Sequence, residues 1–133
     1  MEQSILTSIK KLLGITDEYE AFDEDIKIHI NSVFSVLNQL GVGPKAPFMI
    51  TGKLETWDMF MKTWKDNVDR TDIEMVKTYV YLKVRLIFDP PSNSNVYEAF
   101  VAQAAEYEWR LNVACDETYL EDEEVTTSET TDD

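Results

Sequence analysis

Apolar side chains recur at helical spacing along this chain, and residues 71–88 show the most distinctive pattern because they are apolar on two separate sides. One stripe holds Ile73, Val76, Val80, Val84 and Ile87, and the other holds Met75, Tyr79, Leu82 and Leu86. A helix with two apolar stripes is usually surrounded by other elements. We therefore expect a central helix over about residues 72–88, capped by Thr71 with Glu74 and ended by Asp89-Pro90-Pro91.

The N-terminal part predicts two amphipathic helices. In residues 4–13 the apolar side chains share one face, Lys10 and Lys11 lie away from it, and Gly14 suits the helix end. Residues 25–40 form the most regular helix, with Asp23 or a neighbour as its cap. Ile28 projects from its polar side, either as a lone exposed apolar residue or as a contact with another subunit.

The middle of the chain predicts a break and then a short helix. Two glycines and two prolines in residues 41–47 end the preceding helix, and an exposed loop with an extended piece at residues 48–51 follows. Residues 54–65 place Trp57, Phe60, Met61 and Trp64 on one side of a helix. We expect these side chains in the core rather than at an interface, because large aromatics dominate small cores.

A last helix is expected from Asn95, paired with Glu98 as a cap, to about residue 118. Trp109, flanked by Ala102 and Ala105, falls on the face turned away from the predicted core. An exposed tryptophan among alanines favours a self-association surface, with burial under the N-terminal helix as the alternative.

These segments together predict an all-α protein, a compact bundle of four to five helices around the central one. With 133 residues, 44% of them hydrophobic, the chain fits one domain, expected over residues 1–115. Residues 116–133 carry nine acids and no base, and form an acidic C-terminal tail. Such a segment is disordered alone, or folds on binding a partner.

Charge and composition exclude several classes of protein. The net charge is −14, but nine of the 26 acids lie in the tail, so 17 acids and 12 bases leave −5 over residues 1–115. Nucleic-acid binding through a basic patch is therefore disfavoured. No apolar run approaches the roughly 20 residues that span a bilayer, and the N-terminus does not resemble a secretory signal, so we expect no membrane partner.

No catalytic or cofactor motif emerges from the sequence. His29 and Cys115 are the single histidine and cysteine, and neither has a candidate partner for nucleophilic or metal chemistry. Phosphate-binding glycine motifs are absent, and Asp23-Glu24-Asp25 lacks the alternating ligands of a calcium loop. We expect neither an enzyme nor a cofactor.

The order of several short motifs resembles a known family. They are a helix ending KKLLGI, an acidic spacer, a helix ending LNQLGVG, a tryptophan-bearing segment and a long helix closing at FDPP. Over residues 4–115 the chain resembles the head-tail connector (adaptor) proteins of tailed bacteriophages, in particular the QLRG-type DNA-packaging group. Gln39-Leu40-Gly41 stands at that signature, without its arginine.

The resemblance implies a helical virion protein without catalytic residues, made in the host cytoplasm. It implies a ring, twelve copies in the virion, that assembles under the portal protein at the head-tail interface and extends the DNA channel. The ring would carry the stopper or tail-completion protein, and DNA would pass through without specific binding.

Helical-wheel positions then suggest three contact sets. Candidate subunit contacts are Ile28, Ala102, Ala105 and Trp109. Candidate portal-docking residues are Tyr119, Leu120, Glu121, Asp122, Glu123 and Glu124. Candidate residues at the lumen or the next ring are Gly43, Lys45, Phe48 and Lys53. The rival function is a small acidic regulatory protein or DNA mimic that binds a host protein, although acids gathered in a tail suit a mimic poorly.

Overall fold

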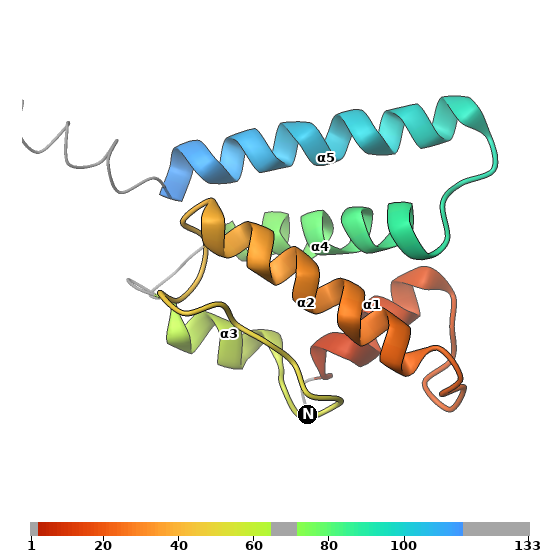
Figure 1. Cartoon of the computed structure of the whole chain (residues 1–133), viewed down its shortest axis with the longest axis horizontal. Coiled ribbons are helices and arrows are strands. Elements are labelled where there is room, and N and C mark those ends of the chain that lie inside the picture. The colour runs from red at the N-terminus through yellow and green to blue at the C-terminus, as the bar shows by residue number, and fades with distance from the viewer. Residues whose placement is uncertain (1–2, 65–71, 116–133) are drawn as a thin grey trace, which may run out of the picture.

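The computed structural model describes residues 3–64 and 72–115, which form five α-helices and no strand (Figure 1). The helices are α1 (Ile5–Leu13), α2 (Asp23–Gln39), α3 (Trp57–Thr63), α4 (Asp72–Phe88) and α5 (Ser94–Cys115). The prediction of an all-α bundle is confirmed. The acidic tail, and Thr71 as the cap of α4, lie outside the described residues.

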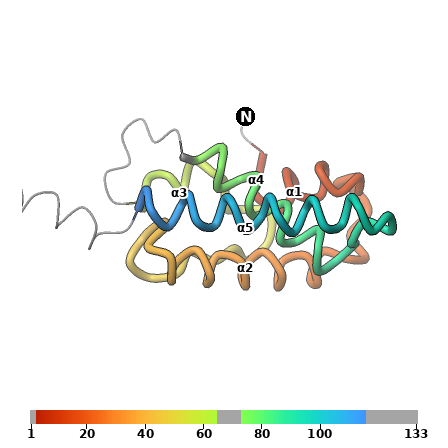
Figure 2. The backbone as a smooth tube through the Cα atoms, turned by 90° about the horizontal axis from the view of Figure 1, so that it is seen from above, coloured from red at the N-terminus to blue at the C-terminus, as the bar shows by residue number. Residues whose placement is uncertain are grey.

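Helix α4 is the central element, as its two apolar stripes predict. It packs against α5, α2 and α1, and Figure 2 shows α5 running over it with α2 along one side and α1 and α3 along the other. Val76, Val80 and Val84 of one stripe and Tyr79 and Leu82 of the other are buried. Ile87 is the exception, since it is exposed near the end of the helix.

Helix α1 begins and ends as expected, but its faces differ from the prediction. Ser4 caps it by accepting a hydrogen bond from the Thr7 amide, and Gly14 ends it in the left-handed conformation. Lys10, expected away from the apolar face, is completely buried, whereas Leu12 is exposed. A lysine can take this place because its long stem is apolar and only its head needs polar partners.

Helix α2 begins two residues earlier than predicted, and its N-cap is a neighbour of Asp23 rather than Asp23 itself. Phe22 occupies the N-cap position and makes no side-chain capping bond, while Asp23 lies inside the helix. Asp23, Glu24 and Asp25 fill the first turn, where negative charge is favoured by the helix dipole. Ile26, Ile30, Val33 and Leu37 are buried as the pattern predicts, joined by Phe34.

The segment between α2 and α3 is held by a side chain rather than by a strand. Gly41 and Gly43 have positive φ values of 82° and 97°, which turn the chain away from α2. The expected extended piece at residues 48–51 joins no sheet. Instead the Asn31 side chain donates to the Ile50 carbonyl at 3.0 Å and accepts from the Ile50 amide at 2.8 Å.

Helix α3 contributes the aromatic part of the core. Trp57, Phe60 and Trp64 are buried, and the Phe60 ring is stacked on Phe34 with centroids 5.4 Å apart. Phe48 contacts the same Phe60 ring edge-on. The prediction of a core role for this side of the helix is confirmed.

The cap of helix α5 lies two residues earlier than expected. The Asn93 side chain accepts hydrogen bonds from the amides of Asn95 and Val96, so Asn93 and not Asn95 is the cap. The helix is joined to the centre of the bundle by Tyr79, whose buried hydroxyl donates to Glu108 at 2.7 Å. Burial and this bond to a carboxylate raise the pKa of the Tyr79 hydroxyl above its ordinary value.

Candidate functional site

The outer face of α5 is an exposed apolar surface. Trp109 is 66% exposed, and Ala102, Ala105, Val101 and Val113 are exposed on the same helix. The alternative of burial under the N-terminal helix is therefore wrong for Trp109. An exposed tryptophan among small residues is typical of a contact surface. The structure shows that this face is exposed, and its role as a subunit contact stays a prediction.

Ile28 belongs to a different part of the surface. It is 56% exposed in the second turn of α2, whereas Trp109 lies in the last two turns of α5. The two helices run in the same direction across the bundle in Figure 1, so these positions lie toward opposite ends of the molecule. Ile28 and Trp109 do not form one patch, and their predicted role as subunit contacts requires two separate surfaces.

A second surface, which we name the aromatic patch, consists of Tyr19, Phe22, His29 and Phe88. The Tyr19 and Phe22 rings lie 5.6 Å apart, Phe22 meets the edge of Phe88 at 5.2 Å, and His29 contacts Phe88 at 6.4 Å. Tyr19 and Phe22 are exposed. Sequence reasoning missed this patch because two of its members lie in the acidic connector, where no helical period marks them.

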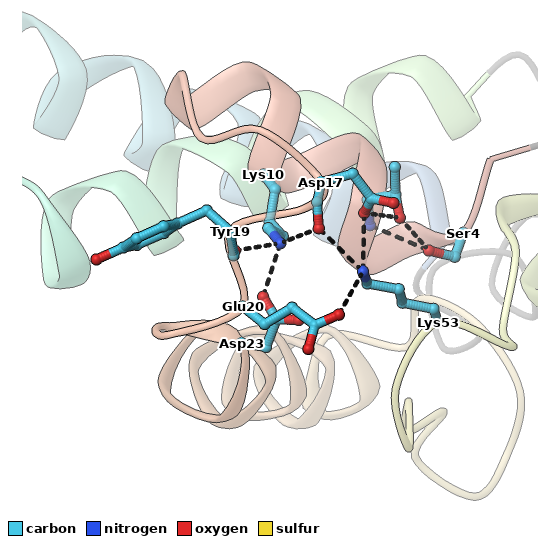
Figure 3. Close-up of polar contacts among 8 residues, drawn as sticks. Ser4, Lys10, Asp17, Tyr19, Glu20, Asp23 and Lys53 are labelled. Atoms are coloured by element: carbon cyan, nitrogen blue, oxygen red, sulfur yellow. Dashed lines mark hydrogen bonds and ion pairs between the residues drawn. The ribbon is translucent and has the colours of Figure 1, made fainter.

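Buried Lys10 fixes the connector that carries Tyr19 and Phe22 (Figure 3). Its ammonium donates to the carbonyls of Asp17 and Tyr19 at 3.0 and 2.7 Å and pairs with Asp23 Oδ1 at 2.8 Å. One cation thus satisfies two backbone oxygens of the connector and forms an ion pair with a carboxylate in the first turn of α2. The aromatic patch consequently rests on a defined backbone.

Lys53 holds the same connector from outside. Its ammonium donates to the Asp17 carbonyl, pairs with the Asp17 carboxylate at 3.1 Å and lies 3.9 Å from Glu20 (Figure 3). Hydrogen bonds from the Thr7 hydroxyl and from Lys53 lower the pKa of Asp17. Lys53, predicted for the lumen or the next ring, therefore also ties the loop before α3 to the connector.

The other residues predicted for the lumen or the next ring are placed unequally. A Cβ on Gly43 would meet the Phe60 ring at 3.0 Å, and Phe48 packs edge-on against Phe34, so both face the core. Lys45 is exposed, and neighbouring Met49 is exposed with it. Only the outer part of this loop is available for a partner, and its assignment stays a prediction.

These surfaces can be set beside known proteins. The family model described as "Phage connector protein" matches residues 5–118, which covers all five helices. The chain belongs to the phage connector protein family. No curated protein and no solved structure matched the chain.

Membership gives this phage connector a structural role in the virion. The match supports the head-tail connector resemblance, while the QLRG subtype, indicated by Gln39-Leu40-Gly41, stays a prediction. The family is one of structural proteins rather than enzymes. The six predicted portal-docking residues, Tyr119 to Glu124, lie outside the described residues.

In residues 3–64 and 72–115 no group of three or more His, Cys, Asp or Glu side chains could hold a metal ion. A shallow pocket between α1, α3 and α4 is lined by Gln3, Ser8, Ile9, Leu12, Trp57 and Lys77. Among these same residues no helix is long and apolar enough to cross a bilayer.

Proposed function

We propose that this chain is the head-tail connector subunit that forms a ring beneath the portal, extends the DNA channel and carries the stopper or tail-completion protein. The family match over residues 5–118 is the observation that carries the proposal. Twelve copies, one for each portal subunit, are the expected stoichiometry, and assembly in the host cytoplasm precedes incorporation into the virion.

A ring requires two different surfaces on each subunit, because its neighbours are related by rotation rather than by a two-fold axis. The outer face of α5, with Trp109, Ala102 and Ala105, supplies one exposed apolar surface. The aromatic patch is another, and exposed Ile28 lies on the same helix as His29. These separate surfaces support a heterologous contact between neighbouring subunits.

The charge of the body suits a conduit for DNA. Residues 1–115 carry 17 acids and 12 bases, so they do not neutralise many phosphates. Tight binding of DNA comes mainly from phosphates paired with lysine and arginine. A mildly acidic ring would let DNA slide, with Lys45 and the outer part of its loop at the lumen or the next ring.

We assign the portal contact to residues 116–133, treated as a unit separate from the helical body of residues 1–115. Tyr119 and Leu120 supply apolar anchors, followed by four consecutive acids, Glu121 to Glu124. A polar segment with few anchors gains little by folding alone and can order on a partner.

The test is the mass of the purified protein mixed with the portal, measured by native mass spectrometry for the full chain and for a truncation after Cys115. We expect the full chain to join the portal in about twelve copies, one per portal subunit. The truncation should not join. A full chain that stays monomeric with the portal, or forms a small complex with a host protein instead, would refute the ring and favour the regulatory alternative.

A further inference from the structure

The two ends of the bundle differ in charge. Residues 15–25, which comprise the connector and the first turn of α2, contain six acids and no base. At the other end, residues 40–48, 59–64 and 109–115 contain Lys45, Lys62 and Arg110, and the acids nearest to two of these cations are Asp58 and Glu106, one helical turn before them. We name these three side chains the cationic end.

The turn after α2, which leads to Lys45, lies beside the point where the described chain stops. The Cys115 carbonyl oxygen lies only 3.1 Å from where a Cβ on Gly41 would be, and the Asn112 side chain donates to the Leu40 carbonyl at 3.4 Å. The Asn38 side chain holds the carbonyls of Pro44 and Lys45 at 3.0 and 2.9 Å. Figure 1 shows the end of α3 on this same side of the molecule.

The positive side chains there are accessible to a further partner. Lys45 is exposed and pairs with no carboxylate among the described residues. Lys62 and Arg110 pair with Asp58 and Glu106 on their own helices, 3.1 and 2.9 Å away. Such exposed i,i+4 pairs are weak, at about 0.3–0.5 kcal/mol, so both cations can be shared with other anions.

The segment that leaves from this point is the most acidic of the chain. Residues 116–133 contain nine acids and no base, and start directly after Cys115. At about 3.3 Å per residue, a segment of this length spans up to about 60 Å when extended, well beyond the roughly 33 Å length of α5, so it is long enough to reach the cationic end. A tethered segment is present at millimolar effective concentration, so weak attractions suffice to bring it there.

We propose that residues 116–133 dock in cis on the cationic end of the unassembled subunit, through carboxylates that pair with Lys45, Lys62 and Arg110. Residues 116–133 are the expected ligand of this surface because they follow directly after Cys115 and carry nine acids. The contact is electrostatic and exposed, so it weakens as salt screens it.

The consequence for assembly rests on the proposed function. If the tail binds the portal, it must first leave its own subunit, so the cis contact and the portal compete for the same carboxylates. The cis contact lowers the apparent affinity of the tail for the portal and for any other basic surface met earlier, by the fraction of tails that are docked.

Zero-length carbodiimide crosslinking of the isolated full-length monomer tests the contact, since the reagent joins lysines to carboxylates that already touch. Peptide mapping should place tail carboxylates on Lys45 and Lys62. Lys11 and Lys53, on the opposite side of the charge division, are internal controls that should gain few tail crosslinks. We expect about tenfold fewer tail crosslinks at 1 M NaCl, where screening acts within about 3 Å.

Matched variants separate a specific contact from general stickiness. Lys45→Met should reduce total tail crosslinking at least about twofold, because it removes the unpaired member of three cations, whereas exposed Lys11→Met should leave it unchanged. Tail crosslinks spread evenly over Lys11, Lys45, Lys53 and Lys62, or insensitive to salt, would overturn the proposal. Because no portal is present, that failure would leave the ring measurement of the proposed function untouched.

Discussion

Lys10 is a buried charge whose compensation comes entirely from a neighbouring segment. Its ammonium has three oxygen partners, two of them carbonyls of the connector and the third the Asp23 carboxylate. Removing one partner of a buried ion pair leaves the other without compensation, which costs more than the pair itself contributes.

We predict that Lys10→Met lowers the free energy of unfolding by about 3 kcal/mol, because Asp23 and two carbonyls lose their donor. The melting temperature should fall by about 10 °C in a domain of this size. Calorimetry of the variant measures this. Lys11→Met, the same substitution at an exposed neighbour, is the control and should change stability by less than about 0.5 kcal/mol. An equal effect of both would contradict the burial of Lys10.

Glu55 gives the protein a stability term that depends on pH. Burial raises the pKa of its carboxyl, but hydrogen bonds from the backbone and hydroxyl of Thr51 and from the backbone of Gly52 and of Glu55 itself bring the net pKa below the ordinary 4.5. A lowered pKa means that the folded state favours the charged form. This stabilisation is present above pH 4.5 and is lost as the pH falls through the folded-state pKa.

We predict that Glu55→Gln destabilises the protein by about 1 kcal/mol at pH 7, and that this deficit shrinks as the pH falls below 4.5 and through the lowered folded-state pKa of Glu55, where the carboxyl becomes protonated. Urea unfolding from pH 3 to pH 7 measures the difference. A deficit that is constant over this range would show that the carboxylate charge has no part in it.

The residue scale is where sequence reasoning failed most. Periodicity placed Lys10 on the polar side, because the pattern registers the charge and not the apolar stem. Its carbonyl partners are fixed by the path of the connector, which no local rule gives. The aromatic patch was missed for the same reason, since Phe22 and Phe88 meet only through tertiary packing.

At the scale of elements, the glycine turn after α2 is fitted against α3. Gly43 has a positive φ of 97°, and a Cβ added to it would lie only 3.0 Å from ring carbons of buried Phe60. The absence of a Cβ therefore leaves room for this ring. Gly14 also has a positive φ of 83°, but nothing lies within 4 Å of a Cβ there. The two glycines separate the conformational cost of an added methyl from its steric cost.

We predict that Gly43→Ala destabilises by about 3 kcal/mol, the sum of about 1 for left-handed backbone and about 2 for overpacking against Phe60. Gly14→Ala should cost only about 1 kcal/mol. Chemical denaturation of the two variants measures both. If the two costs are the same, the close packing of the turn on α3 is refuted.

Helix α5 carries a prediction about association rather than stability. Trp109→Ala should leave the melting temperature nearly unchanged, because the side chain is exposed, while weakening the contact between subunits by about 2 kcal/mol. Native mass spectrometry with the portal measures the assembled fraction. Leu54→Ala, at an exposed apolar residue of the loop before α3, is the matched control and should assemble normally. Normal assembly of the Trp109 variant would exclude the outer face of α5 from the ring.

Element positions were largely predictable, and their ends were not. Apolar periodicity located all five helices, because each must bury an apolar stripe. It also predicted the central place of α4, because a helix with two apolar stripes needs neighbours on two sides. The cap at Asn93 lies two residues before the predicted Asn95, since several neighbouring polar residues could each serve, and α2 begins after Phe22 without any side-chain cap. Helix α3 is shorter than its pattern because Trp64 continues the apolar face after the helix has ended.

At the scale of the whole molecule, the core of the described residues extends over nearly their whole length. The cluster of buried side chains runs from Ile5 to Cys115. We predict that truncation after Cys115 changes the free energy of unfolding by less than about 1 kcal/mol, as expected for loss of surface contacts. Thermal unfolding at 1 M NaCl, where charge contacts are screened, provides the comparison. A larger loss would mean that the tail belongs to the folded domain.

Cys115 links this boundary to chemistry. It is the single cysteine of the chain, is 7% exposed, and closes α5 against the turn at Gly41. A buried thiol reacts slowly with a maleimide, so alkylation proceeds at the rate at which the last turn of α5 lifts away. Alkylation of Cys115 therefore serves as an intrinsic probe of local opening at the end of α5. In assembled particles, the half-time of alkylation would report how strongly assembly slows the opening of the last turn of α5, without any introduced label.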